Sequence, residues 1–385
     1  MNRKSLKLAI SVVFVAAFTA SAQSPVTRTA YHDYRLVTVA EGLANPWAIA
    51  FLPDGDILIS EKPGRLRIVR DGQLLPEPVS GVPEVFAERQ GGLLDVVAHP
   101  DFSSNRLLYL TFSKPLPGGE STTAVARGRF EGNRLTGVEE IFEAQSRGRG
   151  HYGSRLAFDG NGYIFVTVGE RQARAAGDLE RHPAQDLSNH HGVVVRLHED
   201  GRVPADNPFV DTQGVLPEIW TYGHRNPQGL VIHPDTGDVW ITEHGPQGGD
   251  ELNLLRPGAN YGWPVVGYGV NYNTGLAIHE GTLREGMESP VHFWVPSIAT
   301  SGLMVYTGDH FPEWKGNILS GGLAGQRVVR LVMEGSAVVH EETILRGSGR
   351  IRDVRQGLDG YIYVAVDGRD GALTEIFRLE PVPGS

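Results

Sequence analysis

Short apolar runs separated by turn residues recur along most of this chain. In one unit, LAF (156–158) and YIFVTV (163–168) flank the turn DGNG, and the runs are rich in aromatic and β-branched residues. Apolar positions spaced as on an amphipathic helix are scarce. The pattern predicts short antiparallel strands joined by tight turns.

Six segments repeat this arrangement of two apolar runs around a turn that contains aspartate. The turn aspartates are Asp54, Asp101, Asp159, Asp235, Asp309 and Asp359. Successive aspartates lie 47 to 76 residues apart, and repeats of roughly 40 to 50 residues with four strands each are typical of propeller blades. We therefore expect an all-β fold, a six-bladed β-propeller with four-stranded antiparallel blades. The long intervals after Asp159 and Asp235 should carry loop insertions on one face. A β-sandwich or two tandem barrels remain alternatives.

The first 22 residues differ from the repeats. The basic opening MNRKSLK precedes the apolar run LAISVVFVAAFTA, and the small residues SAQ follow. This order predicts a signal peptide cleaved after Ala22. A membrane anchor is the alternative, but the run is shorter than the roughly 20 residues of a spanning helix. We expect residues 23–385 to form one propeller catalytic domain that is periplasmic or secreted, without stable membrane insertion.

Composition excludes several kinds of chemistry. The chain has no cysteine, which rules out disulfides, thiolate nucleophiles and thiolate metal sites. Its formal net charge of −10 argues against a nucleic-acid partner.

Polar groups stand at one phase of the repeat, at the entry to successive blades. They are Gln90, His151, Arg225, Asn226, Arg350 and Arg352. In a propeller such segments converge at one mouth of the central channel. Three arginines around one cavity predict a polyanionic ligand, because guanidinium binds carboxylates bidentately. Taken singly, each residue is also explained as a turn residue or a solvated surface charge. The two arginines of RIRD could also belong to an edge strand and pair with Asp353 or another acid.

The stretch 241–264 predicts a site for a hard cation. Gly245 and Pro246 offer backbone carbonyls, Asp250 and Glu251 offer carboxylates, and the region of Tyr261 offers further carbonyls. Calcium takes six to eight oxygen ligands in loose geometry. In an alternative interpretation, which does not exclude the first, Asp250 and Glu251 cap a short helix over ELNLL.

Several motifs in order resemble a known family between about residues 34 and 379. They are GLANPWAIAFLPDGDILISEKPGRLRIV, QGGLLDVVAHPDF, GHYGSRLAFD, YGHRNPQGL, EHGPQGGDELN, NYGWP and RIRDV. The chain resembles the soluble aldose sugar dehydrogenases that depend on pyrroloquinoline quinone (PQQ), the glucose/sorbosone dehydrogenase family. The resemblance implies an exported six-bladed propeller with the quinone over its channel on a calcium ion (Ca²⁺). It also implies oxidation of an aldose at C1 to the lactone, with electrons passed to an external acceptor (a quinone, a cytochrome or a dye). We expect a monomer or homodimer.

The resemblance implies roles for the matching residues. His151 matches the general base that takes the anomeric proton as hydride leaves C1 for the quinone C5. Gln90 matches a group that binds the sugar and the quinone edge, and Arg225 the arginine beside the C5 oxygen. The other matches are Asn226 for the cofactor's polar edge, Arg350 and Arg352 for its carboxylates, Gly245 and Pro246 for the catalytic calcium, and Glu251 and Tyr261 for a second calcium. Activity should fall at acid pH as the imidazole charges near its ordinary pKa of about 6.5.

Two positions depart from the family's pattern. Ala324 stands where glucose-type members place a quinone-contacting lysine, with Arg327 nearby as a possible substitute. Gly150 stands where they place an acidic residue, which leaves the natural sugar open. Two rival functions also stay open. A calcium-dependent lactonase needs a carboxylate and amide cage at the channel centre, and a non-catalytic propeller would only bind a sugar.

Overall fold

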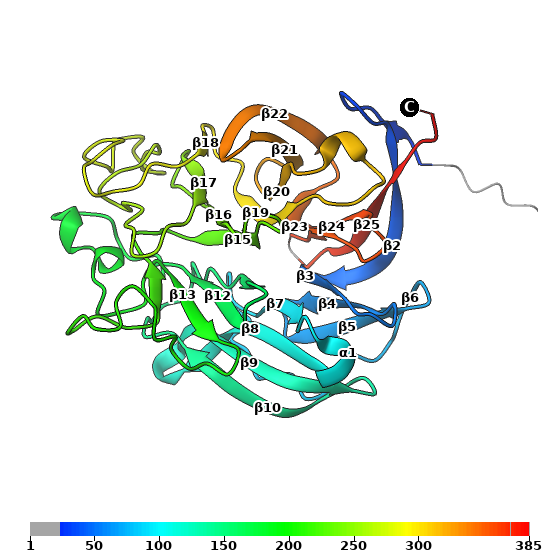
Figure 1. Ribbon diagram of the computed structural model, residues 1–385, viewed down its shortest axis with the longest axis horizontal. Coiled ribbons are helices and arrows are strands. Elements are labelled where there is room, and N and C mark those ends of the chain that lie inside the picture. Colours follow the sequence, from blue (N-terminus) through cyan, green and yellow to red (C-terminus); the bar gives the residue numbers. More distant parts are fainter. Residues whose placement is uncertain (1–23, 370, 385) are drawn as a thin grey trace, which may run out of the picture.

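The computed structural model describes residues 24–369 and 371–384, which form six antiparallel sheets around an axis (Figure 1). The predicted signal peptide lies outside these residues. Blade 1 contains β3 (Pro46–Phe51), β4 (Ile57–Glu61), β5 (Arg65–Arg70) and β6 (Gln73–Leu74). Blade 2 contains β7 (Leu93–Ala98), β8 (Leu107–Leu116), β9 (Glu120–Glu131) and β10 (Arg134–Glu143). Blade 3 contains β11 (Leu156–Phe158), β12 (Tyr163–Val168), β13 (Val193–His198) and β14 (Ile219–Thr221).

Blades 4 and 5 contain β15 (Pro227–Ile232), β16 (Val239–Glu243), β17 (Asp250–Leu254) and β18 (His292–Trp294), then β19 (Thr300–Val305), β20 (Ile318–Gly322), β21 (Arg327–Glu334) and β22 (Ala337–Arg346). Blade 6 contains β23 (Arg350–Gln356), β24 (Ile362–Asp367) and β25 (Leu373–Pro381). The labelled innermost strands β3, β7, β15, β19 and β23 lie nearest the centre (Figure 1). The expected six-bladed propeller is confirmed, and the sandwich and tandem-barrel alternatives are wrong.

The two ends of the described chain close the ring. Strand β2 (Tyr34–Ala44) pairs antiparallel with β25 and supplies the fourth strand of blade 6, and β1 (Val26–Thr27) adds a fifth outside it. Figure 1 shows the blue strand β2 beside the red strand β25. The sixth blade therefore forms only when residues from both ends of the chain meet.

The turn aspartates and the insertions lie where the repeat predicts. Each marker, such as Asp159 between β11 and β12, sits between the innermost and second strands of its blade. The long intervals contain the β12–β13 and β17–β18 connections, and residues of both line one cavity. The short helices are α1 (Phe102–Asn105) and the 3-10 turns Pro117–Gly119, Leu179–Arg181, Pro183–Gln185 and Pro312–Trp314.

Apolar layers between neighbouring sheets hold the blades together. Trp47 and Leu58 of blade 1 pack in one buried cluster with Leu94 and Leu110 of blade 2. Full burial of one such leucine stabilises the fold by about 1.5 to 3 kcal/mol. Within the described residues, no helix is long and apolar enough to cross a membrane.

Hydroxyl groups add a repeated polar link between blades. Ser60, Thr111, Thr167 and Thr242 each stand on the second strand of a blade and donate to a carbonyl at the innermost segment of the next blade, over 2.5, 2.7, 3.2 and 3.4 Å. Three of these hydroxyls also accept an N–H from their own blade's innermost segment. These links fix the height at which each blade entry reaches the channel mouth.

Candidate functional site

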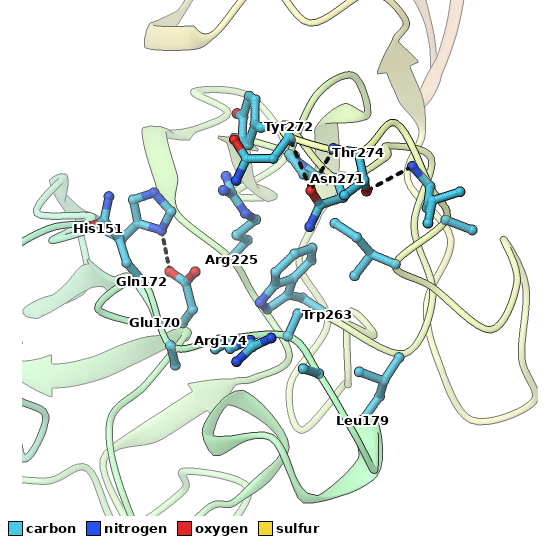
Figure 2. Close-up of a pocket in the computed structure, with 18 of the residues that line it drawn as sticks. His151, Glu170, Gln172, Arg174, Leu179, Arg225, Trp263, Asn271, Tyr272 and Thr274 are labelled. Carbon is cyan, nitrogen blue, oxygen red and sulfur yellow. Dashed lines mark hydrogen bonds and ion pairs between the residues drawn. The ribbon is translucent and has the colours of Figure 1, made fainter.

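Two adjoining cavities open at the channel mouth. The outer cavity, of about 870 Å³, is lined by His151, Glu170 and Arg225 together with the two insertions (Figure 2). The inner cavity, of about 250 Å³, is lined by residues from around the ring, among them Arg350 and Arg352. Gln90 lines both. The structure therefore brings the sequence-predicted residues of four blades to one mouth.

His151 is held in a fixed orientation at the entry to blade 3. Its backbone N donates to Gln90 Oε1 at 2.7 Å, and its Nδ1 lies 2.5 Å from Glu170 Oε2. The residue has a positive φ of 45°, and its side chain is 8 % exposed. A Cβ at Gly169 would lie only 2.3 Å from the His151 carbonyl oxygen, so this close crossing requires glycine. Because Glu170 engages Nδ1, the other ring nitrogen, Nε2, is left for the cavity (Figure 2).

Burial and hydrogen bonding set the protonation of this pair. Burial lowers the pKa of His151, although the charge of Glu170 opposes the shift. Burial alone would raise the pKa of Glu170, but the charge and hydrogen bond of His151 outweigh it and lower that pKa. At neutral pH the pair is a neutral imidazole donating Nδ1–H to a carboxylate. Such an imidazole can accept a proton at Nε2.

Arg225 lies at the entry to blade 4, in the wall of the outer cavity. Its backbone N donates to Glu243 Oε2 at 2.7 Å, and its Nη1 donates to Gly245 O at 2.6 Å. The guanidinium lies 5.2 Å from the centre of the Trp263 ring. Its Nε is buried without a hydrogen-bond partner in the described part of the chain. The Gly245 carbonyl thus already faces a cation.

A chain of amides joins the inner cavity to the segment of His151. Arg352 Nη1 donates to Gln228 Oε1 at 2.9 Å, and Gln228 Nε2 donates to Asn226 Oδ1 at 3.2 Å. The same Asn226 oxygen accepts the Gly153 N–H at 3.1 Å. Arg350 and Arg352 do not pair with Asp353; both approach Asp367, over 3.4 and 3.6 Å. The sequence alternative, an edge strand whose arginines pair with an acid, is therefore confirmed with Asp367 in place of Asp353, since β23 lies at the edge of its sheet.

The predicted metal ligands gather around a third, smaller cavity. Gly245, Pro246, Glu251 and Tyr261 all line it. Glu251 lies opposite Glu243 in the ladder between β16 and β17, and burial together with the Glu243 carboxylate raises the pKa of Glu251 well above its ordinary value. The short helix proposed for ELNLL is wrong, because these residues lie in β17 and the loop after it.

Backbone carbonyls dominate this candidate metal centre. Asp250 Oδ1 accepts the Gly245 N–H at 3.0 Å, so Asp250 braces the loop. The Tyr261 hydroxyl donates to Leu254 O at 2.6 Å, which leaves the Tyr261 backbone carbonyl as its metal-binding group. Within residues 24–369 and 371–384, no cluster of three or more His, Asp or Glu side chains has metal-binding geometry. Two opposed carboxylates beside carbonyl oxygens suit a hard cation, which would remove their repulsion.

Two functional candidates were missed from the sequence. Lys62 directly follows the second strand β4, and Glu170 follows the second strand β12 after one glycine, Gly169. Both strands end at the mouth where the innermost strands begin. A charged residue that ends an apolar strand was the available signal. Ala324 and Arg327 are not among the residues that line the inner cavity, and Arg327 Nε donates to Gly325 O at 3.3 Å.

Comparisons with known proteins agree with the fold and the motifs. A family model described as glucose/sorbosone dehydrogenase matches residues 43–375. The aldose sugar dehydrogenase YliI of Escherichia coli is 43 % identical over 87 % of this chain and 90 % of its own length. The quinoprotein glucose dehydrogenase B of Acinetobacter calcoaceticus is 31 % identical over 70 % of this chain and 62 % of its own length.

Solved structures show the same relationship. The apo-form of the soluble aldose sugar dehydrogenase of Escherichia coli superposes with a TM-score of 0.84 and 40 % identity, over 91 % of this chain and all of that one (100 %). The PQQ-bound aldose sugar dehydrogenase of Streptomyces coelicolor has a TM-score of 0.71 and 27 % identity, over 91 % of this chain and 98 % of its own. On the family match, the relatives and the shared propeller, this chain belongs to the glucose/sorbosone dehydrogenase family of oxidoreductases.

Proposed function

We propose that this protein oxidises aldose sugars at C1 to the lactone with PQQ as its cofactor, and that residues 23–385 act as one catalytic domain. The observation that carries the proposal is the juxtaposition of an oriented base with a cation-lined cavity, with Gln90 shared between them. The names of the relatives, a quinoprotein and a PQQ-bound dehydrogenase among them, support the choice of cofactor.

The inner cavity fits a planar tricarboxylate. Arg350 and Arg352 supply guanidinium groups, and the buried Arg352 Nε has no hydrogen-bond partner among the described residues. Asn226 and Gln90 add amide groups at the side toward His151. An anion bound here would accept a hydrogen bond from Arg352 Nε and neutralise the excess positive charge.

His151 acts as the base of the proposed reaction. Glu170 holds Nδ1–H, so the lone pair of Nε2 accepts the proton of the anomeric hydroxyl while C1 becomes the lactone carbonyl. When bound, the quinone supplies the two-electron acceptor that takes the hydride from C1. Arg225 places a positive charge at the cavity wall, where it stabilises negative charge that develops during reduction. Gln90 fixes the His151 backbone and can bind the sugar.

Calcium is the second proposed cofactor. The Gly245 and Pro246 carbonyls would hold the catalytic ion, and Glu251 with the Tyr261 carbonyl would hold a structural one. The support is the donor set, since the Gly245 carbonyl already accepts from a cation and Glu251 faces another carboxylate. A bound ion there acts as a Lewis acid.

The rival lactonase fits the centre of this propeller poorly. The carboxylates Asp95 and Asp353 near the axis are both bridged by Arg155, at 3.6 and 3.1 Å. A metal cage would need those carboxylates free. The remaining parts of the proposal are export to the periplasm or medium, transfer of electrons to an external acceptor and a monomeric or homodimeric state.

Reconstitution tests the proposed function. Purified protein is incubated with PQQ, calcium, both or neither, and reduction of an electron-accepting dye is followed with several aldoses. We expect sugar-dependent reduction only with both. Absence of quinone binding, or hydrolysis of lactones without the quinone, would reject the proposal.

A further inference from the structure

Lys62 is a cationic residue of the inner cavity to which the family resemblance assigned no role. It directly follows β4 and is half-buried in the wall of the cavity. Its Nζ donates to Arg89 O at 2.9 Å. A Cβ at Gly92 would lie 2.0 Å from Lys62 O, so the two segments cross in direct contact. Lys62 is thus fixed at this wall by both its backbone and its ammonium group.

Positive charge exceeds negative charge around this cavity. Its lining contains Lys62, Arg89, Arg350 and Arg352 but one carboxylate, that of Asp367. Asp367 is shared by Arg350 and Arg352. Lys62 has no carboxylate within salt-bridge distance in the part of the chain that is described. The four cations of this lining therefore face a single carboxylate, which two of them share.

This arrangement is electrostatically unfavourable for the charged form of Lys62. Burial and the nearby charge of Arg352 both lower the pKa of its ammonium group. A half-buried ammonium among guanidinium groups is unfavourable unless an anion neutralises it. The uncompensated charge is therefore explained by an anionic ligand that touches Lys62 as well as the arginines.

We propose that Lys62 binds one carboxylate of the quinone and supplies from blade 1 the cation that Ala324 does not supply from blade 5. This inference rests on the proposed function, because it takes PQQ as the ligand of the inner cavity. The bond to Arg89 O also braces the loop that carries Gln90, which would be a purely structural role. The two roles differ in whether the ligand's charge matters.

Quinone binding by charge-matched variants tests the proposal. Apoprotein with calcium is titrated with PQQ and, separately, with its uncharged trimethyl ester, following the quenching of tryptophan fluorescence. For Lys62→Gln we expect the dissociation constant of PQQ to rise roughly 10- to 100-fold, the loss of one charged hydrogen bond, and that of the ester to change little. Lys62→Arg should restore most of the affinity for PQQ. Lys315→Gln, which removes an exposed lysine paired with Asp309, is the matched control.

The outcomes separate this inference from the proposed function. If the wild-type protein does not bind PQQ, the proposed function fails and the inference falls with it. If the wild type binds PQQ but Lys62→Gln binds it equally well, the inference alone is overturned. An equal loss for PQQ and its ester, together with a lower unfolding temperature of the apoprotein, also overturns it, because Lys62 would then act as a brace.

Discussion

At the scale of single residues, the pairing of His151 with Glu170 controls when the base is available. The imidazole must be neutral to accept a proton, so activity is retained above its pKa and lost as the pH falls through it. Burial lowers that pKa, and the acid limb of the pH–rate profile should therefore lie below 6.5. The expectation of a limb near the ordinary value, made from the sequence alone, needs this correction because burial is invisible there.

The Glu170→Gln variant tests whether the Glu170 carboxylate orients the His151 imidazole or only packs against it. We expect kcat/KM to fall roughly 10- to 100-fold, the loss of a charged hydrogen bond. Because Glu170 opposes the lowering of the His151 pKa, its removal should also move the acid limb to lower pH. A complete pH–rate profile of both proteins measures this. An acid limb that stays in place or moves upward would contradict the assigned pair.

The opposed carboxylates of Glu243 and Glu251 give a second prediction at this scale. Glu251→Gln removes their repulsion and should raise the unfolding temperature measured in a chelator. The wild type should gain about 2.7 kcal/mol when calcium reaches about 100 times its dissociation constant, and the variant less than half of that. Thermal unfolding with and without calcium measures both effects. Equal stabilisation of the two proteins by calcium would argue against Glu251 as a ligand.

The site was only partly predictable from the sequence. Gln90, His151, Arg225 and Arg350 repeat at one phase of the blade and so could be placed at one mouth. Glu170 could not be placed there, because it reaches the mouth at the end of a second strand. The repeat does not indicate which second strands end in a functional residue.

At the scale of strands, the hydroxyl links position the blade entries. Thr111 on β8 accepts the Asp95 N–H at 2.9 Å and donates to Ser154 O at 2.7 Å. Innermost strands of several blades carry a bulge near such a group, as β7 does between Leu93 and Val96. The hydroxyl satisfies a backbone group that the bulge leaves without a ladder partner.

Thr111→Val keeps the shape of the side chain but removes both hydrogen bonds. Two buried backbone groups lose their partner, which should destabilise the fold by about 1 to 3 kcal/mol. Thr38→Val, on exposed β2 surface, makes the same chemical change and should have little effect. Urea unfolding of the three proteins measures the difference. An unchanged free energy of unfolding for Thr111→Val would show that the hydrogen bonds of the Thr111 hydroxyl do not stabilise the fold.

The failed helix over ELNLL shows why local signals were insufficient. Asp250 and Glu251 resemble a helix start, but β17 pairs with β16 on one side and β18 on the other. Sheet pairing with residues as distant as Trp294 outweighs the local preference.

At the scale of the whole molecule, Arg155 joins the blades at the axis. It bridges Asp95 of blade 2 and Asp353 of blade 6, donates to Gln228 O of blade 4 at 2.8 Å, and its guanidinium lies 4.0 Å from the Trp47 ring of blade 1. Its side chain is 1 % exposed. Two members of this network, Trp47 and Gln228, also line the inner cavity.

Arg155→Met should weaken the entire ring. Removing one partner leaves two buried carboxylates less compensated, and the loss of a buried charge partner costs about 3 to 5 kcal/mol. Arg129→Met, on the exposed surface of β9, is the control and should change stability by less than about 0.5 kcal/mol. Denaturant unfolding measures both. A similar loss of unfolding free energy in the two variants would contradict a central role for Arg155 in holding the blades together.

The repeat predicted the number of blades, because each blade contains a turn aspartate between two apolar runs. It did not predict how the ring closes. Strand β2 precedes the first repeat, and its partner β25 lies at the other end of the chain. Periodicity describes local units, whereas closure depends on a contact between the two ends.

Reduction of the bound quinone by sugar in a single turnover tests the central claim, that one imidazole at this mouth takes the proton of a sugar while cations of other blades hold the quinone. Wild type and His151→Gln are loaded with PQQ and calcium, mixed with excess aldose, and followed by the absorption spectrum of the quinone. Both proteins should bind the quinone, and the variant should reduce it about 100- to 10,000-fold more slowly. Equal rates of reduction in the two proteins would contradict the account.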